Sequence, residues 1–203
     1  MNYLINDVNK VGVFWSSGLE STLLLLMCIE KYGKENVYAF TQKFPGDDPY
    51  SDGAQHYHYY ARQLADEIQF NNLFMIETAS NGFYSNSLRE QTYYKAIELV
   101  PDIEVIYLGI NIVSFGTFVN EELRNVILDK IQQLQLISMP FLNVTKDEIV
   151  KMYYEYGYEK LIPLTRTCSK NTPLHCGKCS GCKDRKLAFK KNGIIDPTDY
   201  KIL

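Results

Sequence analysis

Four cysteines near the C-terminus have the spacing of a metal site. They follow the pattern C-x7-C-x2-C-x2-C and are Cys168, Cys176, Cys179 and Cys182. In a reducing compartment, clustered cysteines are more often metal ligands than disulfides, and four thiolates form a closed, tetrahedral zinc site of structural character. An iron–sulfur cluster is the competing interpretation, since four cysteines also suit iron. The spacing favours zinc, as does the short basic turn that carries the last three cysteines, residues 176–182, which we call the knuckle. His175 is adjacent, yet four cysteines already fill the coordination shell, so we expect it beside the ligands or on the surface.

A run of small and hydroxyl-bearing residues forms a second candidate site. We call residues 16–22 the serine loop; they are Ser16, Ser17, Gly18, Leu19, Glu20, Ser21 and Thr22. Small residues let the backbone turn sharply and approach an anion, and the N-terminus of a following helix offers unpaired N–H groups and a partial positive charge. These features suit a phosphate or pyrophosphate, although the loop lacks the lysine of a P-loop and the glycine spacing of a dinucleotide-binding motif. An ordinary capped helix after a strand is the alternative, and the residues alone leave both open.

Strands that alternate with helices must position these residues. The apolar patterns predict strands over 10–15, 36–43, 68–77, 104–108 and 136–141, and helices over 22–33, 54–66, 85–100, 119–133, 145–157 and 183–191. Thr145 and Glu148 have the spacing of a capping box. Alternation of this kind predicts an α/β fold with a parallel sheet. Ligands bind such sheets beyond the carboxyl ends of the strands, here at 16–21, 42–54 and 109–118.

The composition is that of a globular chain without a strong overall charge. The 203 residues include 46% hydrophobic and 22% charged residues, with 21 basic and 24 acidic side chains, which excludes a disordered protein, a fibre and a pure disulfide scaffold. The longest apolar run, residues 23–29, is too short to span a bilayer, and the first ten residues carry no secretory signal. We therefore expect a cytoplasmic enzyme or binding protein, of one domain or one domain with a small appendage.

The charge is unevenly distributed along the chain. Residues 166–191 contain eight basic residues and one acidic residue, Asp184, whereas residues 1–165 contain 12 basic and 21 acidic residues. A basic tail with clustered cysteines motivates one alternative function, a zinc-knuckle module that binds nucleic acid without catalysis. Many basic tails are only solvated surface, and the acidic body opposes binding to a polyanion. Nucleic acid is therefore not the expected partner.

Together, these segments resemble the 7-cyano-7-deazaguanine synthase family, QueC, of the PP-loop pyrophosphatase superfamily. The serine loop is similar to that family's S-G-G-x-D-S, and residues 145–149 (TKDEI) are similar to its T-K-x-E-I helix start. Gly109 and Asn111 are similar to the G-x-N after its fourth strand. The most specific likeness is the tail, C-G-x-C-x-x-C-x-x-R-x-x-A-F, which runs here from Cys176 to Phe189.

The resemblance implies a doubly wound, mostly parallel, Rossmann-like sheet. It divides the chain into an ATP-binding α/β domain, residues 1–160, and a lobe that binds zinc through the four cysteines, residues 161–203. The implied reaction adenylates the carboxylate of 7-carboxy-7-deazaguanine and passes the acyl group to ammonia, and a second activation gives the nitrile, 7-cyano-7-deazaguanine. AMP and pyrophosphate are released. The serine loop would hold ATP with Mg²⁺ sharing its charge, Gly109 and Asn111 would contact the substrate, and the protein would be a homodimer.

Three departures from the family pattern bear on this interpretation. Ser17 replaces a glycine, Glu20 replaces an aspartate, and residues 112–118 (IVSFGTF) replace an acidic stretch that would help to shape the base pocket. Glu20 keeps the charge and would position ATP or a magnesium ion. Such divergence is similar to QueC-like proteins of bacterial antiviral gene clusters, which join the deazaguanine to a protein amine. A non-catalytic scaffold with a degenerate loop is a further alternative.

Overall fold

Five parallel strands form a sheet at the centre of the fold. The computed structural model describes residues 3–43, 57–77, 86–111, 129, 133–170 and 172–201. The sheet has the order β3-β2-β1-β4-β5, and every neighbouring pair is parallel. The strands are β1 (Val11–Phe14), β2 (Val37–Lys43), β3 (Leu73–Glu77), β4 (Val105–Leu108) and β5 (Ile137–Ser138). This arrangement confirms the predicted α/β fold with a doubly wound, parallel sheet.

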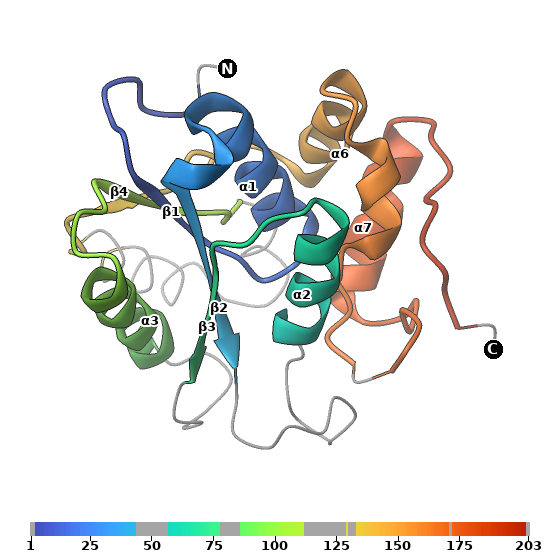
Figure 1. Ribbon diagram of the computed structural model, residues 1–203. Helices are drawn as coiled ribbons and strands as arrows, with labels where there is room; N and C mark the ends of the chain where they lie inside the picture. The colour runs from blue at the N-terminus through green and yellow to red at the C-terminus, as the bar shows by residue number, and fades with distance from the viewer. Residues whose placement is uncertain are drawn as a thin grey trace.

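Helices cover both faces of this sheet, as Figure 1 shows. They are α1 (Leu19–Tyr32), α2 (Tyr57–Glu67), α3 (Asn86–Leu99), α6 (Lys146–Glu155) and α7 (Ser180–Lys191), with the short 3-10 helices η1 (Lys34–Asn36) and η2 (Glu159–Leu164). The helix α3 packs on one face, and α1, α2, α6 and α7 pack on the other. Among the described helices, none is long and apolar enough to cross a membrane.

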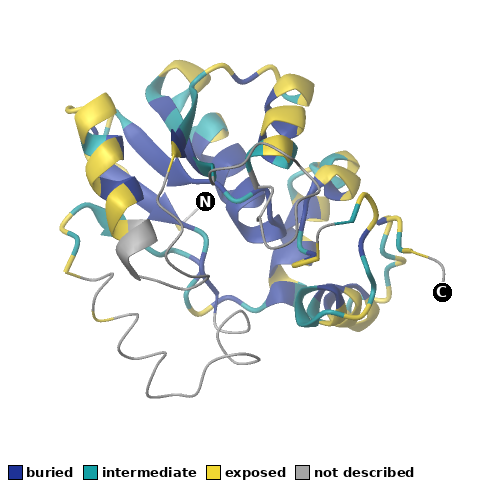
Figure 2. Ribbon diagram, turned by 90° about the horizontal axis from the view of Figure 1, so that it is seen from below, coloured by how far each residue is buried: buried dark blue, intermediate teal, exposed yellow. Residues whose placement is uncertain are grey.

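Successive side chains of the strands point to opposite faces of the sheet, and both faces are buried. In β1, Val11 and Val13 pack with apolar residues of α1, α2, α6 and α7. Phe14 of the same strand packs on the opposite face with Tyr93 and Ala96 of α3. Figure 2 shows the resulting buried interior in dark blue, with exposed residues on the outer surfaces of the helices. Burial on both faces explains why the strands are continuous apolar runs in the sequence.

Most predicted elements are found, with shifted ends. The helix α1 begins at Leu19 rather than at residue 22, and α7 begins at Ser180 rather than at residue 183, so part of each candidate site lies in the first turn of a helix. The strand predicted over 136–141 covers only Ile137–Ser138. The cause is Pro140, which has no N–H for the ladder and lies where the chain enters a turn.

Some predicted segments lie outside the described residues. They include the loop at 44–53 and the stretch at 112–118 that differs from the family pattern. They also include the helix predicted over 119–133, apart from residues 129 and 133.

The helices α6 and α7 join the C-terminal part of the chain to the sheet. The predicted capping box of α6 is confirmed: the Glu148 amide donates to Thr145 Oγ1 (3.4 Å), and the Thr145 amide donates to Glu148 Oε2 (2.7 Å). Ala188 and Phe189 of α7 lie in the same apolar cluster as residues of α1 and α6. The C-terminal part thus shares a core with the sheet, and the division into two domains at residue 160 stays a prediction.

Candidate functional site

The order of the strands reverses at β1, which lies between β2 and β4. In doubly wound sheets, ligands bind at this switch point, beyond the carboxyl ends of the strands. The serine loop follows β1, and Gly109 follows β4. A Cβ on Gly109 would lie 2.9 Å from the Cα and the N of Ser21. Glycine is therefore required where the end of β4 meets the first turn of α1, and a substrate contact by Gly109 stays a prediction.

The serine loop makes a left-handed turn at Ser17. The φ angle of Ser17 is 58°, a value that glycine adopts freely and other residues adopt rarely. The Ser17 side chain is buried, and its hydroxyl donates a hydrogen bond to the carbonyl oxygen of Ser16. A glycine, which the resembled family has at this position, would make the same turn without strain. The substitution therefore keeps the shape of the loop at a cost in stability.

The N-cap residue of α1 is Gly18, which has no side chain that could cap the helix. The first amides of the helix therefore gain no partner from that position. The Ser16 and Ser21 hydroxyl oxygens lie 3.1 Å apart, and Ser16 is half-buried while the rest of the loop is buried. Trp15 Nε1 donates to Thr22 Oγ1 (3.0 Å), which engages that hydroxyl within the protein. The Ser21 hydroxyl is engaged as well, since it accepts from the Ser16 amide (3.2 Å) and donates to the Gly18 carbonyl oxygen (3.4 Å). The loop can thus offer an anion the first backbone N–H groups of α1 and the half-buried Ser16 hydroxyl.

A buried ion pair joins the serine loop to α6. Lys146 Nζ lies 2.9 Å from Glu20 Oε1, and the two side chains are 6% and 10% exposed. Asn111 Nδ2 donates to the same carboxylate oxygen (3.1 Å). Burial opposes the ionisation of Glu20, but the charge of Lys146 and its hydrogen bond outweigh burial and lower the pKa of Glu20 below its ordinary value. Glu20 is therefore ionised, and Lys146 neutralises it.

The structure brings together two residues that the sequence predicted separately. Glu20 was predicted to position ATP or Mg²⁺ and Asn111 to contact the substrate, and both now share one hydrogen-bonded group with Lys146. Lys146 was not predicted as a site residue, although the TKDEI segment that contains it was the available signal. Because Glu20 Oε1 already accepts two hydrogen bonds, a cation there would compete with Lys146. The roles of Glu20 and Asn111 toward ligands stay predictions.

Thr41, near the carboxyl end of β2, is a further polar residue of the site that was not predicted from the sequence. It is 1% exposed, and its hydroxyl has no hydrogen-bond partner among the residues that the structure describes. It shares a face of the sheet with Val37 and Ala39, the face that α1 covers. A buried hydroxyl is unfavourable without a partner. Thr41 is therefore a candidate ligand contact, and the signal for it was a threonine after the apolar run YAF.

The four cysteines come together beside the N-terminus of α7, and we call them the cysteine cluster. Their sulfur atoms all lie within 4.8 Å of one another, and the Sγ atoms of Cys168 and Cys179 are 3.9 Å apart. Sulfur atoms that bind one tetrahedral ion at about 2.3 Å lie about 3.8 Å apart. The cysteine cluster therefore fits a single ion. An iron–sulfur cluster needs a wider set of ligands, because its own iron and sulfide atoms lie between them.

Amide groups of the knuckle stabilise the thiolates. Cys168 Sγ accepts hydrogen bonds from the amides of Lys170 (3.4 Å) and Cys176 (3.3 Å). Cys176 Sγ accepts one from the amide of Cys179 (3.3 Å). A hydrogen bond with the Cys182 thiol, together with the two amides, lowers the pKa of Cys168 to about 4. The thiolate is the form that binds metal ions, so this donor set suits a cation.

Gly181 allows the knuckle to pack against the chain that carries Cys168. A Cβ on Gly181 would overlap the carbonyl oxygen of Thr167. No other residue fits between the first turn of α7 and this backbone, so the glycine within the C-x2-C repeat is a packing requirement.

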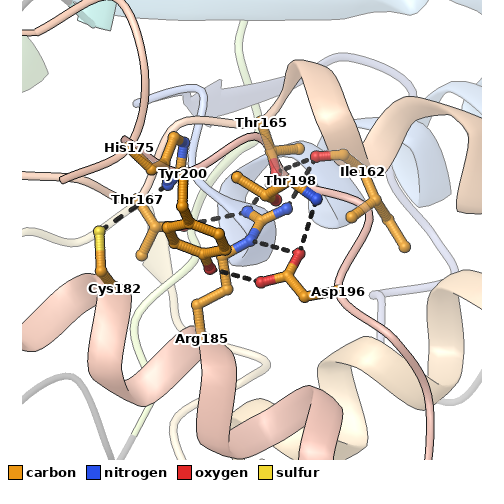
Figure 3. A network of polar contacts seen from close by, with 9 residues as sticks. All are labelled: Ile162, Thr165, Thr167, His175, Cys182, Arg185, Asp196, Thr198 and Tyr200. Atoms are coloured by element: carbon orange, nitrogen blue, oxygen red, sulfur yellow. Dashed lines mark hydrogen bonds and ion pairs between the residues drawn. The ribbon is translucent and has the colours of Figure 1, made fainter. Parts of the chain in front are cut away.

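A buried arginine connects α7 to the segments around the cysteine cluster (Figure 3). Arg185 is fully buried and donates to the carbonyl oxygen of Ile162 (2.9 Å). It also donates to the hydroxyls of Thr165 (2.7 Å) and Thr167 (3.3 Å). Its Nε lies 3.3 Å from Asp196 Oδ1. The arginine of the R-x-x-A-F motif therefore fixes the chain before Cys168 against α7.

His175 is buried beside the cysteine cluster. Its Nδ1 lies 3.9 Å from Cys182 Sγ, and its ring packs edge-on against the ring of Tyr200. Burial and the charges of Arg185 and Arg166 lower the pKa of His175 to about 4, so the imidazole is neutral near pH 7. Of the two expected positions, beside the ligands or on the surface, the structure shows the first.

The fold and these two sites define a class of protein: a doubly wound α/β chain with a candidate anion loop at its switch point and a separate tetracysteine cluster. Residues 101–193 match the family model described as "Queuosine biosynthesis protein QueC". The predicted resemblance to QueC is thus confirmed over this part of the chain, which includes Lys146 and the cysteine cluster.

Curated relatives agree with the family match. The chain is 36% identical over 105 residues to the 7-cyano-7-deazaguanine synthase of Saccharolobus solfataricus, a match that covers 48% of this chain and 22% of that protein. It is also 36% identical over 83 residues to the 7-cyano-7-deazaguanine synthase of Rhizobium etli, which covers 40% of this chain and 33% of that protein. The matched stretches therefore span a third or less of the length of these relatives.

A solved structure supports the fold. The U34-tRNA thiolase NcsA from Methanococcus maripaludis, solved with its [4Fe-4S] cluster, is similar to this chain with a TM-score of 0.51. The superposition covers 93% of this chain and 68% of that chain, at 12% sequence identity. At this identity the likeness bears on the fold alone.

Two substitutions of Ser17 separate backbone strain from the loss of its hydroxyl. We expect Ser17→Gly to be more stable than Ser17→Ala by about 1 kcal/mol, because both lack the hydroxyl and only alanine has a Cβ at this positive φ. The measurement is the free energy of unfolding in urea, with the protein metal-loaded. Equal stabilities, or a more stable alanine variant, would contradict the strain at Ser17.

Removal of Lys146 tests the buried ion pair. Lys146→Met leaves the Glu20 carboxylate buried without its cation, and we expect the free energy of unfolding at pH 7 to fall by about 3–5 kcal/mol. The double variant Lys146→Met, Glu20→Gln removes both charges and should recover most of this loss. Urea unfolding of the wild type, the two single variants and the double variant gives the interaction energy.

The fall in the free energy of unfolding of Lys146→Met should become smaller at lower pH. In the wild type the pKa of Glu20 is lowered, so the stability from the pair is present above the ordinary value of 4.5 and is lost as the pH falls below it. In Lys146→Met, burial acts without Lys146 and raises the pKa of Glu20. The deficit of that variant should therefore shrink between pH 7 and pH 5, and a deficit independent of pH would mean that lost packing causes it.

Proposed function

We propose that this protein uses ATP to activate the carboxylate of a 7-deazaguanine, with release of AMP and pyrophosphate. The observation that carries the proposal is the serine loop at the switch point, with the Lys146–Glu20 pair beside it, in a chain whose residues 101–193 match QueC. The family resemblance implies 7-carboxy-7-deazaguanine as the substrate. The product would then be 7-cyano-7-deazaguanine, the compound for which the matched relatives are named.

Adenylation would turn a poor electrophile into a reactive one. A carboxylate oxygen of the substrate forms a bond to the α-phosphorus of ATP, the bond to the bridging oxygen breaks, and pyrophosphate leaves with the electron pair. Negative charge grows on the pyrophosphate, and the amides at the start of α1 with the Ser16 hydroxyl would stabilise it. No protein nucleophile is needed, so the step requires only binding, orientation and charge stabilisation.

Ammonia would then attack the acyl-adenylate. Its nitrogen forms a bond to the acyl carbon, AMP leaves with its electron pair, and one proton passes to solvent, which gives an amide. A second ATP activates the amide oxygen in the same way. Loss of that oxygen with AMP and of two protons from nitrogen gives the nitrile, so two ATP are consumed for each nitrile.

Lys146 and Asn111 would be positioning residues in this reaction. An unpaired carboxylate beside an anion site would repel phosphates. Because Lys146 neutralises Glu20, the partial positive charge of the amides at the N-terminus of α1 would dominate the electrostatic potential there. Asn111 binds the same oxygen of Glu20 as Lys146 does. It would therefore keep the carboxylate turned toward the lysine.

We also propose that the cysteine cluster binds a structural Zn²⁺ ion through Cys168, Cys176, Cys179 and Cys182. The spacing of the sulfur atoms, which suits a single ion, supports zinc over an iron–sulfur cluster. Four thiolates leave the ion no open coordination position. Its contribution would be to stabilise the C-terminal part of the chain rather than to take part in the chemistry.

The acceptor of the acyl group distinguishes two versions of the proposal. A protein amine in place of ammonia is the alternative suggested by the defence-associated QueC-like proteins, and the same adenylation precedes both.

A nucleic-acid-binding module has less support, because two lysines of α7 are engaged within the protein. Lys186 lies 4.1 Å from the centroid of the Tyr200 ring, and Lys191 pairs with Asp147 at 2.9 Å. A homodimer remains an expectation from the family.

The test mixes metal-loaded protein with ATP, Mg²⁺, ammonium and 7-carboxy-7-deazaguanine. We expect AMP and pyrophosphate in equal amounts, formed only when the carboxylate is present. Mass spectrometry of the products separates the nitrile from a deazaguanine–protein conjugate. AMP at the level of a reaction without protein overturns the proposal, and tight ATP binding without turnover would indicate the non-catalytic scaffold instead.

A matched pair of serine variants makes this test specific to the loop. Ser16→Ala removes the half-buried hydroxyl of the loop and should lower kcat by about 100-fold, the usual effect of losing one donor to a developing negative charge. Ser138→Ala, in the edge strand β5, should leave kcat unchanged.

Metal analysis tests the proposal for the cysteine cluster. We expect one zinc ion per chain in protein purified under reducing conditions, without the visible absorption of an iron–sulfur cluster. Cys176→Ser should lose zinc and unfold at a lower temperature, since a structural metal adds to folding stability. The control is Cys28→Ser, which changes a buried cysteine outside the cluster and should keep its zinc. Iron with acid-labile sulfide in place of zinc would contradict the expectation.

A further inference from the structure

We propose that Arg166 is a positioning residue that couples the metal of the cysteine cluster to the serine loop. This inference rests on the proposed function, since it links the two sites named there. It concerns residues 165–168, which we call the bridging segment. The Arg166 amide donates to the carbonyl oxygen of Ser17 (2.7 Å), and two residues later Cys168 enters the cysteine cluster.

The Arg166 side chain is fixed by the chain that connects the first two cysteines of the cluster. It is 7% exposed. Its Nη2 donates to the carbonyl oxygens of Lys170 (2.9 Å) and Thr172 (2.6 Å), and its Nη1 donates to that of Pro173 (3.4 Å). The guanidinium also lies 4.8 Å from the centroid of the Tyr60 ring in α2. The planar guanidinium carries its five donors on three separate nitrogens and so reaches carbonyls that lie apart, whereas the donors of a lysine all lie on one nitrogen.

Arg185 holds the bridging segment from α7 (Figure 3). Its guanidinium binds the hydroxyls of Thr165 and Thr167, the residues on either side of Arg166. The carbonyl of Thr167 also packs against Gly181, where a side chain would not fit. The segment is therefore held by two buried arginine side chains. Because the segment is rigid, a displacement of Cys168 would also displace the Arg166 amide.

The contact with Ser17 falls at the strained position of the serine loop. A residue with a φ of 58° persists only when its surroundings hold it. The Arg166 amide binds the carbonyl oxygen of this residue, and a Cβ on Gly18 would lie 3.7 Å from the Arg166 carbonyl oxygen. The bridging segment thus supports the turn that leads into the first amides of α1. An occupied cysteine cluster would order the bridging segment and, through it, the amides that bind phosphate.

The coupling is measured as the ratio of two dissociation constants for MgATP, that of metal-free protein over that of metal-loaded protein. The metal is removed with a chelator in the presence of a reductant, and binding is measured by isothermal titration calorimetry. We expect a ratio of at least about fivefold in the wild type. In Arg166→Ala the ratio should fall close to one, with the metal-loaded variant binding MgATP as weakly as the metal-free wild type.

Two further variants separate this role from a general effect of charge. Arg166→Lys keeps the charge but has one donor nitrogen in place of the two that reach the three carbonyls, so it should behave like Arg166→Ala. Arg62→Ala changes an exposed arginine of α2 and should keep the ratio of the wild type.

A second readout does not depend on nucleotide. Hydrogen exchange of the amides in residues 16–22 should be faster in the metal-free wild type and in metal-loaded Arg166→Ala than in the metal-loaded wild type. A wild-type ratio of one, or Arg166→Ala with both the ratio and the exchange of the wild type, overturns the inference. Loss of metal from Arg166→Ala also overturns it, because Arg166 would then only build the cysteine cluster. Absence of MgATP binding in every form would overturn the proposed function, while hydrogen exchange still decides the coupling.

Discussion

The arrangement of the chain at the carboxyl ends of β1 and β4 depends on the ion pair between Glu20 and Lys146. Buried charges are unfavourable unless they are paired, so the first turn of α1 and the start of α6 must come together for either charge to be buried. Asn111, just after β4, completes the group. Tyr153 of α6 adds a second link, since its hydroxyl donates to the carbonyl oxygen of Leu19 (2.9 Å). Three segments distant in the sequence are thereby fixed at one point.

The two sites depend on the chain in different ways. The cysteine cluster is built mostly from one short stretch, whose amides and glycine shape it locally. The serine loop depends on α6, on the end of β4 and on the bridging segment. The family match covers residues 101–193 and so includes Lys146 but not the loop. The ion pair therefore connects the matched part of the chain to Glu20, where the loop departs from the family pattern.

Features built from local sequence could be predicted, whereas features that depend on distant segments of the chain could not. The capping box at Thr145 and the spacing of the cysteines are local patterns, and both identified groups that the structure brings together. The start of α1 at Leu19 was missed, because small polar residues indicate a turn as readily as a first helical turn. The contacts of Lys146 and Arg166 could not be predicted, since each partner is set by tertiary packing or is a backbone carbonyl that carries no sequence signal.

Trp15 gives the chain an optical probe of its own. It is the one tryptophan among the 203 residues and immediately precedes the serine loop. Its ring is 1% exposed, and its N–H is bound to the hydroxyl of Thr22, at the far end of that loop. The emission of an indole shifts with the polarity of its surroundings and with the hydrogen bond of its N–H. Intrinsic fluorescence of the unlabelled protein should therefore follow the conformation of the segment between these two residues in real time.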